Sequence, residues 1–301
     1  MRRLLIIGCG DVAMRMVDKV RGRYRTFGLA RSSKQRMLLR AQGIVSVEGD
    51  LDHSKSLHRL SGLATDVVHF VPPPAEGHRD TRTTNLIRAL TRGGSLPQRL
   101  VYLSTSGVYG DCAGAQIDET RTPLPASPRA RRRLDAEHQL REWGVSSGVT
   151  VIILRVPGIY AADRLPLARI QAGTPVVEST HDAYTNHIHA DDLARITVAA
   201  LLRGRSGRTY NAVDDSSMKM GDYFDLVADE FGLPHPPRVT WQEAQIRLPE
   251  SLLSFARESR RLGNHRLKSE LRVRLTYPMV SEGVRAAHRS ADELAQSGVS
   301  H

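Results

Sequence analysis

Cysteine and long hydrophobic runs are scarce in this 301-residue sequence, which contains two cysteines, Cys9 and Cys112. Two cysteines cannot supply a disulfide framework or the spacing of a cysteine-based metal site, and they suit a reducing compartment. The apolar run near the start, Leu4–Ile7, is too short for the core of a signal peptide. No later stretch is long enough to cross a bilayer. We therefore expect a cytoplasmic protein without a membrane partner.

Lysine is also scarce, although the chain is basic. The formal net charge is +11, yet only five of the 43 basic residues are lysine and 38 are arginine. A bias this strong is typical of a codon preference that places arginine on every solvated face. The densest cluster, Arg129–Arg133, has no interleaved aromatic side chains of the kind that stack on nucleic-acid bases. The net charge alone would suit a nucleic-acid partner, but the arginine bias and the missing aromatics disfavour one; a small anionic ligand needs far less basic surface.

Short apolar runs alternate with helical patterns in the first half of the chain. This alternation is typical of a parallel sheet with helices on both faces. Val151–Leu154 is apolar throughout, as expected for a strand buried on both sides. The expected class is α/β, with a doubly wound parallel Rossmann sheet and a smaller C-terminal substrate-side region. The expected strands are Arg3–Ile7, Arg25–Ala30, Ile44–Glu48, Asp66–Val71, Arg99–Ser104 and Val149–Arg155, and the clearest helix is Arg132–Trp143.

The composition of the sequence changes after Arg155, where prolines and glycines become frequent. We interpret residues 1–155 as an NAD(P)-binding Rossmann domain. Residues 156–301 would form the substrate-side region, packed on the carboxyl ends of the sheet, where ligands bind in open α/β folds, and would also return strands to the main sheet. The elements expected there are a helix at Ala190–Arg203, a strand at Arg208–Val213, and helices around Gly221–Phe231 and Asn264–Arg274.

A glycine-rich turn, Gly8-Cys9-Gly10-Asp11-Val12-Ala13, lies between the first strand and a helix. Gly8 permits the tight turn, Gly10 lets the backbone approach a pyrophosphate, and Ala13 allows close packing of helix and strand. The N–H groups of Asp11 and Val12 would face the phosphate at the positive end of the helix. Because the Asp11 carboxylate is an anion, it must point away from that phosphate. The alternative is a glycine turn without a ligand, which the strand–turn–helix context disfavours.

The residues after the second strand distinguish between the two nicotinamide dinucleotides. NAD-binding chains usually carry an acid there, which accepts from the ribose hydroxyls. This chain has Ala30-Arg31-Ser32-Ser33-Lys34 instead. Arg31 can bind a 2′-phosphate through its planar donor fork, and Ser32 and its neighbours add donors. NADP is therefore favoured over NAD. The alternative, strongest for Ser33, is a helix N-cap serine beside a solvated arginine. Asp50, after the third strand, is a candidate acceptor for the adenine amino group.

Several segments together resemble the extended short-chain dehydrogenase/reductase family, in its sugar-nucleotide epimerase/dehydratase branch. They follow the family order and cover roughly residues 3–215. They are the glycine turn, Gly49–Leu51, Leu103–Asp111, Asp118–Thr120, Leu134–Glu137, Leu154–Tyr160 and Asn186–Ala194. The resemblance implies an NAD(P)-dependent enzyme whose cofactor also contacts Leu51, Val71, Pro72, Ser104 and Pro157. In this chain Val71-Pro72-Pro73-Pro74 replaces the small residues usual after the fourth strand, and proline stiffens that loop.

The family's chemistry uses a Ser or Thr, a Tyr and a Lys. The resemblance places the hydroxyl residue at Thr105, which would orient the substrate oxygen. The Tyr-x-x-x-Lys element falls on Arg129 and Arg133, so the catalytic tyrosine is absent. Arginine offers donors only and stays protonated, so it cannot replace the tyrosine. Arg133 can still reach the ribose hydroxyls. The chain thus resembles the atypical extended members of the superfamily.

Three residues could replace the tyrosine as proton donor or acceptor, if the family layout holds. His187 is favoured by the intrinsic pKa of histidine, which lies near the working pH. Tyr160 and His189 are the others. The alternatives are plain: Tyr160 packs in the core, and His189 bonds to the turn at Asp191-Asp192.

Other kinds of site have weak support. His187-x-His189 with Asp191-Asp192 could suggest a metal site, but capping of a helix N-terminus by one of these aspartates is simpler, so no metal is expected. Asp214–Ser217 is interpreted as a loop that caps the next helix. Motifs of serine hydrolases and nucleotide triphosphatases are absent from the sequence.

Two functions remain. The first is an NADP(H)-dependent oxidoreductase or epimerase-like enzyme with an altered proton donor. Its substrate would be a small molecule, such as a nucleotide sugar or another polar carbonyl or alcohol. The second is a catalytically silent NAD(P)-binding sensor or interaction protein, because loss of the tyrosine lowers a rate without removing the cofactor site. Either could be a homodimer.

Overall fold

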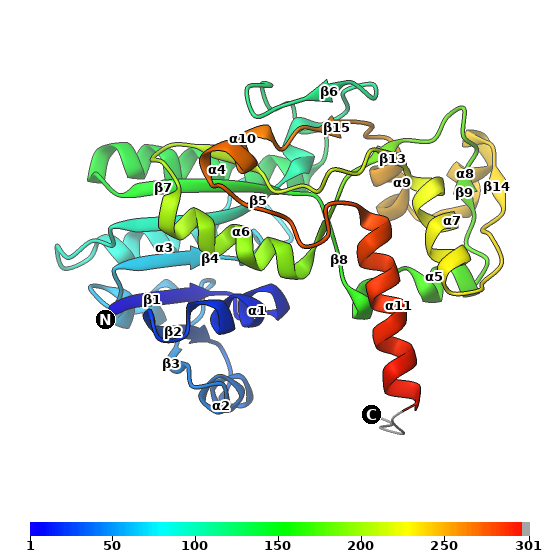
Figure 1. Cartoon of the computed structure of the whole chain (residues 1–301). Helices are drawn as coiled ribbons and strands as arrows, with labels where there is room; N and C mark the ends of the chain where they lie inside the picture. Colours follow the sequence, from blue (N-terminus) through cyan, green and yellow to red (C-terminus); the bar gives the residue numbers. More distant parts are fainter. Residues whose placement is uncertain (297–301) are drawn as a thin grey trace.

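The computed structural model describes residues 1–296, and its centre is a seven-stranded, all-parallel sheet (Figure 1). The strand order is β12-β7-β5-β4-β1-β2-β3, so the order reverses between β1 and β4, where doubly wound sheets bind ligands. The strands are β1 (Arg2–Ile7), β2 (Tyr24–Ala30), β3 (Val45–Glu48), β4 (Asp66–His69), β5 (Arg99–Thr105), β7 (Thr150–Val156) and β12 (Thr209–Asn211).

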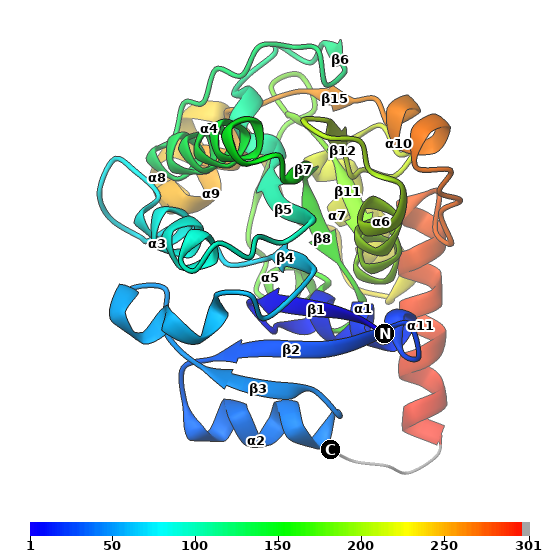
Figure 2. The same ribbon diagram turned by 90° about the vertical axis from the view of Figure 1, so that its left-hand side faces the viewer.

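Helices cover both faces of the sheet because successive strand residues point to opposite sides. Leu4 and Ile6 of β1 pack in one core with α1 (Asp11–Val20) and α6 (Ala190–Arg203). Leu5 and Ile7 pack in a second core on the other face. Figure 2 shows the two helical layers on either side of the sheet. The second core contains residues of η1 (Ser54–Leu60), α3 (Thr81–Thr91) and α4 (Pro128–Ser147); α2 (Ser33–Ala41) lies near β3.

The remaining elements come mostly from the second half of the chain. Figure 1 shows α5, α7, α8 and α9 gathered beyond the carboxyl ends of the strands, with α11 alongside. These elements are η2 (Ser106–Tyr109), β6 (Gln116–Ile117), β8 (Gly158–Tyr160), η3 (Ala162–Arg164), α5 (Leu167–Gln171), β9 (Val176–Val177), β10 (Tyr184–Thr185), β11 (His187–His189), β13 (Met218–Lys219), α7 (Met220–Glu230), β14 (Arg238–Val239), α8 (Trp241–Arg247), α9 (Glu250–Ala256), β15 (Arg261–Leu262), α10 (His265–Glu270) and α11 (Val280–Gln296).

The fold class expected from the sequence is confirmed, and the six strands of the first half differ from it only at their ends. The helix expected at Arg132–Trp143 is longer: Ser127 caps its start, and Gly148 adopts a left-handed conformation at its end. The helix expected at Asn264–Arg274 is shorter and ends at Glu270, before Arg272 takes a positive φ of 50°.

Residues 297–301 of the expected substrate-side region lie outside the described residues. Within residues 1–296, both cysteines are free, and no helix is long and apolar enough to span a membrane.

Candidate functional site

The glycine turn after β1 forms one wall of a groove. Gly8 has a φ of +94°, and a Cβ there would lie 2.8 Å from Cγ2 of Val71, so this position needs glycine. A Cβ at Gly10 would meet nothing within 4 Å, and would project into open space. The groove has a volume of about 220 Å³, and Asp11, Val12 and Arg133 also line it. The turn therefore has the cradle that a dinucleotide pyrophosphate requires.

The Asp11 carboxylate faces two arginines. Arg15 Nε donates to Asp11 Oδ1 at 2.9 Å, and Arg164 Nη2 lies 3.1 Å from Asp11 Oδ2. Arg15 also donates to Asp191 Oδ1 at 2.9 Å. The first N–H groups of a helix have no partner within it, so those of Asp11 and Val12 remain available for a ligand.

The loop after β2 carries the residues that the sequence analysis expects to bind a 2′-phosphate. Arg31 is exposed, and its backbone N–H donates to Gln35 Oε1 at 3.0 Å. The N-cap of α2 is Ser32, whose Oγ accepts from Gln35 N at 3.2 Å. The sequence pointed most strongly to Ser33 for this capping role, but the role belongs to the residue before it. The Ser32 hydroxyl keeps its own hydrogen to donate.

The loop after β3 carries Asp50 and Leu51, the residues expected near the adenine. Asp50 Oδ1 accepts from Asp52 N at 3.0 Å, in a turn that fixes the carboxylate. Leu51 is buried, and its carbonyl accepts from Asn85 Nδ2 at 2.8 Å. The loop is thus held by α3 behind it.

The proline loop after β4 is fastened from two helices. Arg82 Nη1 donates to Pro72 O at 3.1 Å. The buried Arg132 donates to Ala75 O at 2.7 Å and to Gly77 O at 2.8 Å. One arginine of the basic run in α4 therefore acts as a clamp inside the protein rather than as part of a charged surface.

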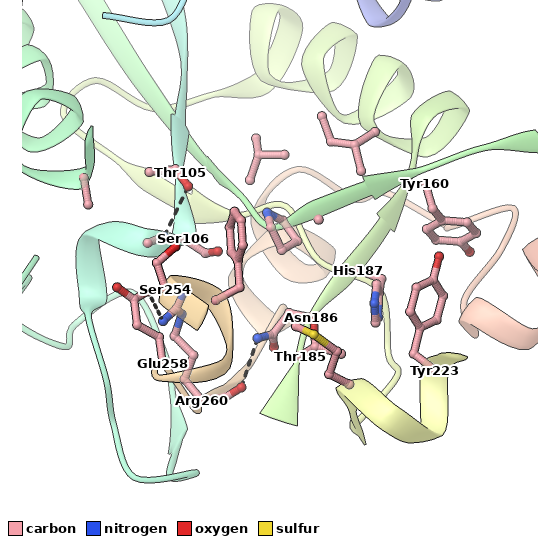
Figure 3. A pocket seen from close by; sticks show the side chains of 18 of the residues that line it. Thr105, Ser106, Tyr160, Thr185, Asn186, His187, Tyr223, Ser254, Glu258 and Arg260 are labelled. Carbon is pink, nitrogen blue, oxygen red and sulfur yellow. Dashed lines mark hydrogen bonds and ion pairs between the residues drawn. The ribbon is translucent and has the colours of Figure 1, made fainter. Parts of the chain in front are cut away.

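A larger cleft of about 570 Å³ opens beside the groove (Figure 3). It brings together Thr105, Arg133, Tyr160 and His187, the four residues expected from the sequence to act in chemistry, with Pro157 between them in the lining. The structure therefore gathers these residues from β5, α4, β8 and β11 at the carboxyl end of the sheet.

Arg133 lies where the cleft meets the groove, and Thr105 lines the cleft next to Ser104, which lines both spaces. Thr105 Oγ1 accepts from Gly107 N at 3.2 Å, and the hydroxyl hydrogen remains free to donate. Arg133 Nη1 donates to Leu103 O at 2.7 Å and to Tyr102 Oη at 3.1 Å. Arg133 lines both spaces.

Ser104 is turned away from this junction. Its Oγ donates to Glu137 Oε1 at 2.6 Å, inside the protein. Glu137 also accepts from Arg155 Nη2 at 2.8 Å, and both of these residues are buried. Ser104 can therefore offer a cofactor its backbone but not its hydroxyl.

His187 is buried against Tyr223, with the two ring centroids 4.3 Å apart. Burial lowers the pKa of His187 to about 4, so the imidazole is neutral at pH 7. The sequence favoured His187 because histidine ordinarily titrates near neutral pH. With its pKa lowered by burial, His187 no longer has this advantage over the other candidates. Nδ1 of His187 has no hydrogen-bond partner within residues 1–296.

Tyr160 is also buried, and burial raises its pKa above the ordinary tyrosine value. Its hydroxyl has no hydrogen-bond partner among the described residues and lies against the backbone of α11, where a Cβ at Gly283 would come within 2.4 Å of Tyr160 Oη. A tyrosinate at this position is therefore disfavoured.

His189 has the structural role that the sequence analysis gave as its alternative, a hydrogen bond to the turn at Asp191-Asp192. Its Nδ1 accepts from Asp191 N at 3.2 Å and caps α6, so the expectation that an aspartate caps this helix is wrong. Asp192 instead accepts from the backbone N–H groups of Thr276 and Tyr277, both at 2.8 Å. Across residues 1–296, no group of three His, Cys, Asp or Glu side chains could hold a metal ion.

Three further polar residues at or near the cleft were missed by sequence reasoning. Arg164 and Arg169 line it, and Arg169 has its guanidinium 4.7 Å from the ring centre of Phe224. Asp214 is buried near Tyr160 and Tyr223, and burial raises its pKa to about 7. It accepts from Ser216 N and caps no helix, contrary to the sequence interpretation; α7 starts after Lys219. None of the three belongs to a recognisable motif.

Comparison with known proteins agrees with this geometry. Residues 10–212 match the NAD dependent epimerase/dehydratase family. Among curated proteins, GDP-6-deoxy-D-mannose reductase of Pseudomonas aeruginosa is 27% identical over 162 residues, covering 49% of this chain and 53% of that protein. UDP-glucose 4-epimerase of Azospirillum brasilense is 28% identical over 200 residues, covering 54% and 56%. The chain thus matches about half the length of these relatives.

Solved structures match over nearly the whole chain. A functionally unknown conserved protein from Silicibacter pomeroyi is 28% identical with a TM-score of 0.79, covering 97% of this chain and 100% of that one. UDP-glucuronic acid 4-epimerase from Bacillus cereus, solved in complex with NAD, is 17% identical with a TM-score of 0.74, covering 97% and 99%. The latter shares the fold. The chain belongs to the NAD dependent epimerase/dehydratase family.

Proposed function

We propose that this protein is an NADP(H)-dependent oxidoreductase or epimerase-like enzyme of the extended dehydrogenase type, without the usual Tyr-x-x-x-Lys pair. The observation that carries the proposal is the cradle at Gly8 and Gly10, which opens on the same cleft as Thr105 and Arg133. The choice of NADP(H) rests on Arg31 and Ser32, because no acid follows β2. A cytoplasmic location and a homodimer remain predictions.

In this proposal, some residues bind the cofactor and others contact the substrate. Gly10 and the N–H groups at the start of α1 would hold the pyrophosphate, and Arg133 the nicotinamide ribose. A bound nicotinamide would supply or accept the hydride. The free hydrogen of the Thr105 hydroxyl would donate to the substrate oxygen. His187, neutral at pH 7, can accept a hydrogen bond, but its lowered pKa makes it a weak base and leaves it no proton to donate as an acid.

The charges of the cleft favour an anionic substrate. Five arginines line it; Arg164 is paired with Asp11, and Arg260 with Glu258. The other three have no carboxylate partner in the part of the chain that the structure describes. They are Arg129, Arg133 and Arg169. Guanidinium groups without a carboxylate partner can bind the carboxylates and phosphates of a ligand, so an acidic or phosphorylated carbonyl or alcohol, a nucleotide sugar included, would fit this lining.

Charge reversal at Arg31 tests the cofactor assignment. Arg31→Asp should weaken NADPH binding by about tenfold or more, since charge-assisted bonds to a phosphate are among the strongest polar contacts. NADH binding should change little. Arg40→Asp, the same reversal at the far end of α2, is the control and should affect neither. Equal losses of NADPH and NADH binding in Arg31→Asp would remove the preference for NADP(H).

The alternative is a catalytically silent sensor or interaction protein. It is favoured by one observation: burial makes both His187 and Tyr160 poor proton donors at neutral pH. The two functions separate in an assay of NADPH oxidation with a panel of phosphorylated and carboxylated carbonyl compounds. Turnover of any panel member supports the enzyme. Tight NADPH binding without turnover across the panel supports the sensor.

A further inference from the structure

An ion-pair network lies across the mouth of the cofactor groove. Asp11 stands in the first turn of α1, with Arg15 Nε 2.9 Å from Oδ1 and Arg164 Nη2 3.1 Å from Oδ2. The two arginines come from different places: Arg15 is one helical turn along α1, whereas Arg164 is the last residue of η3, beyond the sheet. Arg164 thus joins the segment after β8 to the glycine turn.

The position of this pair conflicts with the ligand that the groove would take. A pyrophosphate at the start of α1 would lie next to the Asp11 carboxylate, and like charges repel at such distances. Arg164 lines both the groove and the larger cleft, and its side chain is 34% exposed, so it has room to change partners.

Asp11 would not be left unpaired by such a change. Arg15 holds its other oxygen and is itself anchored to Asp191 on α6 by a 2.9 Å hydrogen bond. An arginine bonds more strongly to a phosphate through two parallel N–H groups than through the single close contact that Arg164 makes with Asp11.

We propose that Arg164 exchanges Asp11 for the pyrophosphate when the dinucleotide binds, and so acts as a binding residue supplied from the substrate side. The inference rests on the dinucleotide site of the proposed function. Asp11 is then a competitor that holds Arg164 at the groove while the groove is free. The exchange also links cofactor binding to the segment that continues into α5 and carries Arg169 to the cleft.

Calorimetric titration of the full chain with NADPH, at fixed ionic strength, tests the exchange. Arg164→Gln should weaken binding by about tenfold or more, and Arg164→Lys by less, because lysine keeps the charge without the fork. Asp11→Asn should tighten binding by about threefold to tenfold, because the competing anion is removed. Asp18→Asn, the same change further along α1 where the carboxylate pairs with Arg21, is the control and should have no effect.

The double variant separates exchange from simple repulsion. If Asp11 acts by holding Arg164, Asp11→Asn should give little tightening in the Arg164→Gln background. Equal tightening with and without Arg164 would overturn the proposal, as would weaker or unchanged NADPH binding in the single Asp11→Asn variant. If Arg164→Gln fails to fold, judged by its thermal transition, Arg164→Lys takes its place in the cycle. Failure of the unmodified chain to bind any dinucleotide would overturn the proposed function as well.

Discussion

Buried polar groups are satisfied differently beneath the two ends of the cleft. Beneath the cofactor end, Glu137 accepts from Ser104 and from two nitrogens of Arg155, so both of its oxygens are bonded. At the far end, Tyr160 Oη, His187 Nδ1 and Asp214 Oδ2 have no hydrogen-bond partner among the described residues. A buried polar group without a partner costs free energy. Arg155 Nη1, beneath the cofactor end, is also without a partner, but the rest of that guanidinium is bonded to Glu137, whereas the single hydroxyl of Tyr160 makes no hydrogen bond in the described structure.

The same division runs through the functional residues. The glycine turn has the steric features that a dinucleotide needs, whereas the family resemblance places Arg129 and Arg133 at the positions of the proton-transfer pair. Arg129 lines the cleft, with its guanidinium 5.1 Å from the ring centre of Phe255. We therefore propose that the cofactor end keeps the family's arrangement and that the reaction end is altered.

The largest expected loss of unfolding free energy comes from removing the Glu137 carboxylate beneath the cofactor end. Glu137→Ala leaves the buried Arg155 without its counter-ion and Ser104 without its acceptor. Removing one member of a buried ion pair costs about 3–5 kcal/mol of unfolding free energy. Urea denaturation measures the loss. The control is Glu142→Ala, an exposed residue of the same helix. A loss in Glu137→Ala no larger than the control's would refute the contrast.

An intermediate and pH-dependent effect is expected at Asp214. Burial raises the pKa of its carboxyl to about 7 in the folded protein, from an ordinary value near 3.8. The folded state then binds the proton more tightly, so this group's contribution to stability is present below pH 4 and is lost as the pH rises to about 7. Asp214→Asn removes that loss and should gain stability relative to the unmodified chain as the pH rises, by on the order of a few kcal/mol.

Urea denaturation at pH 5 and pH 8 measures this difference. The groups that face Asp214, namely Tyr160, Asp192, Asp215 and Tyr223, are the same in both proteins and cancel. Asp18→Asn, which removes an exposed carboxylate that pairs with Arg21 away from this site, serves as the control. A stability difference for Asp214→Asn that is the same at both pH values would contradict the expectation.

The smallest effect is expected at Tyr160. Tyr160→Phe removes a hydroxyl that makes no hydrogen bond in the described structure, so the unfolding free energy should stay the same or rise by about 1 kcal/mol. The matched variant is Tyr109→Phe, whose buried hydroxyl donates to Asn211 Oδ1 at 2.8 Å. That variant should lose about 1–2 kcal/mol. If both variants lose the same amount, the two ends of the cleft do not differ in this respect.

Local signals in the sequence were enough to predict the sheet and the glycine turn. The alternation of strand and helix and the position of Gly8 each depend on a few neighbouring residues. The environment of His187 depends on contacts with distant parts of the chain, such as Tyr223, so its lowered pKa could not be predicted. Arg164 escaped notice for the same reason, because its partner Asp11 lies far away in the sequence.

A calorimetric titration of the unmodified chain with NADPH and NADH tests the central claim most directly. Arg31, Ser32 and the absence of an acid after β2 lead us to expect NADPH to bind at least about tenfold more tightly. Binding of NADH with equal or greater affinity would contradict the cofactor assignment. Binding of neither dinucleotide would contradict the account of the site.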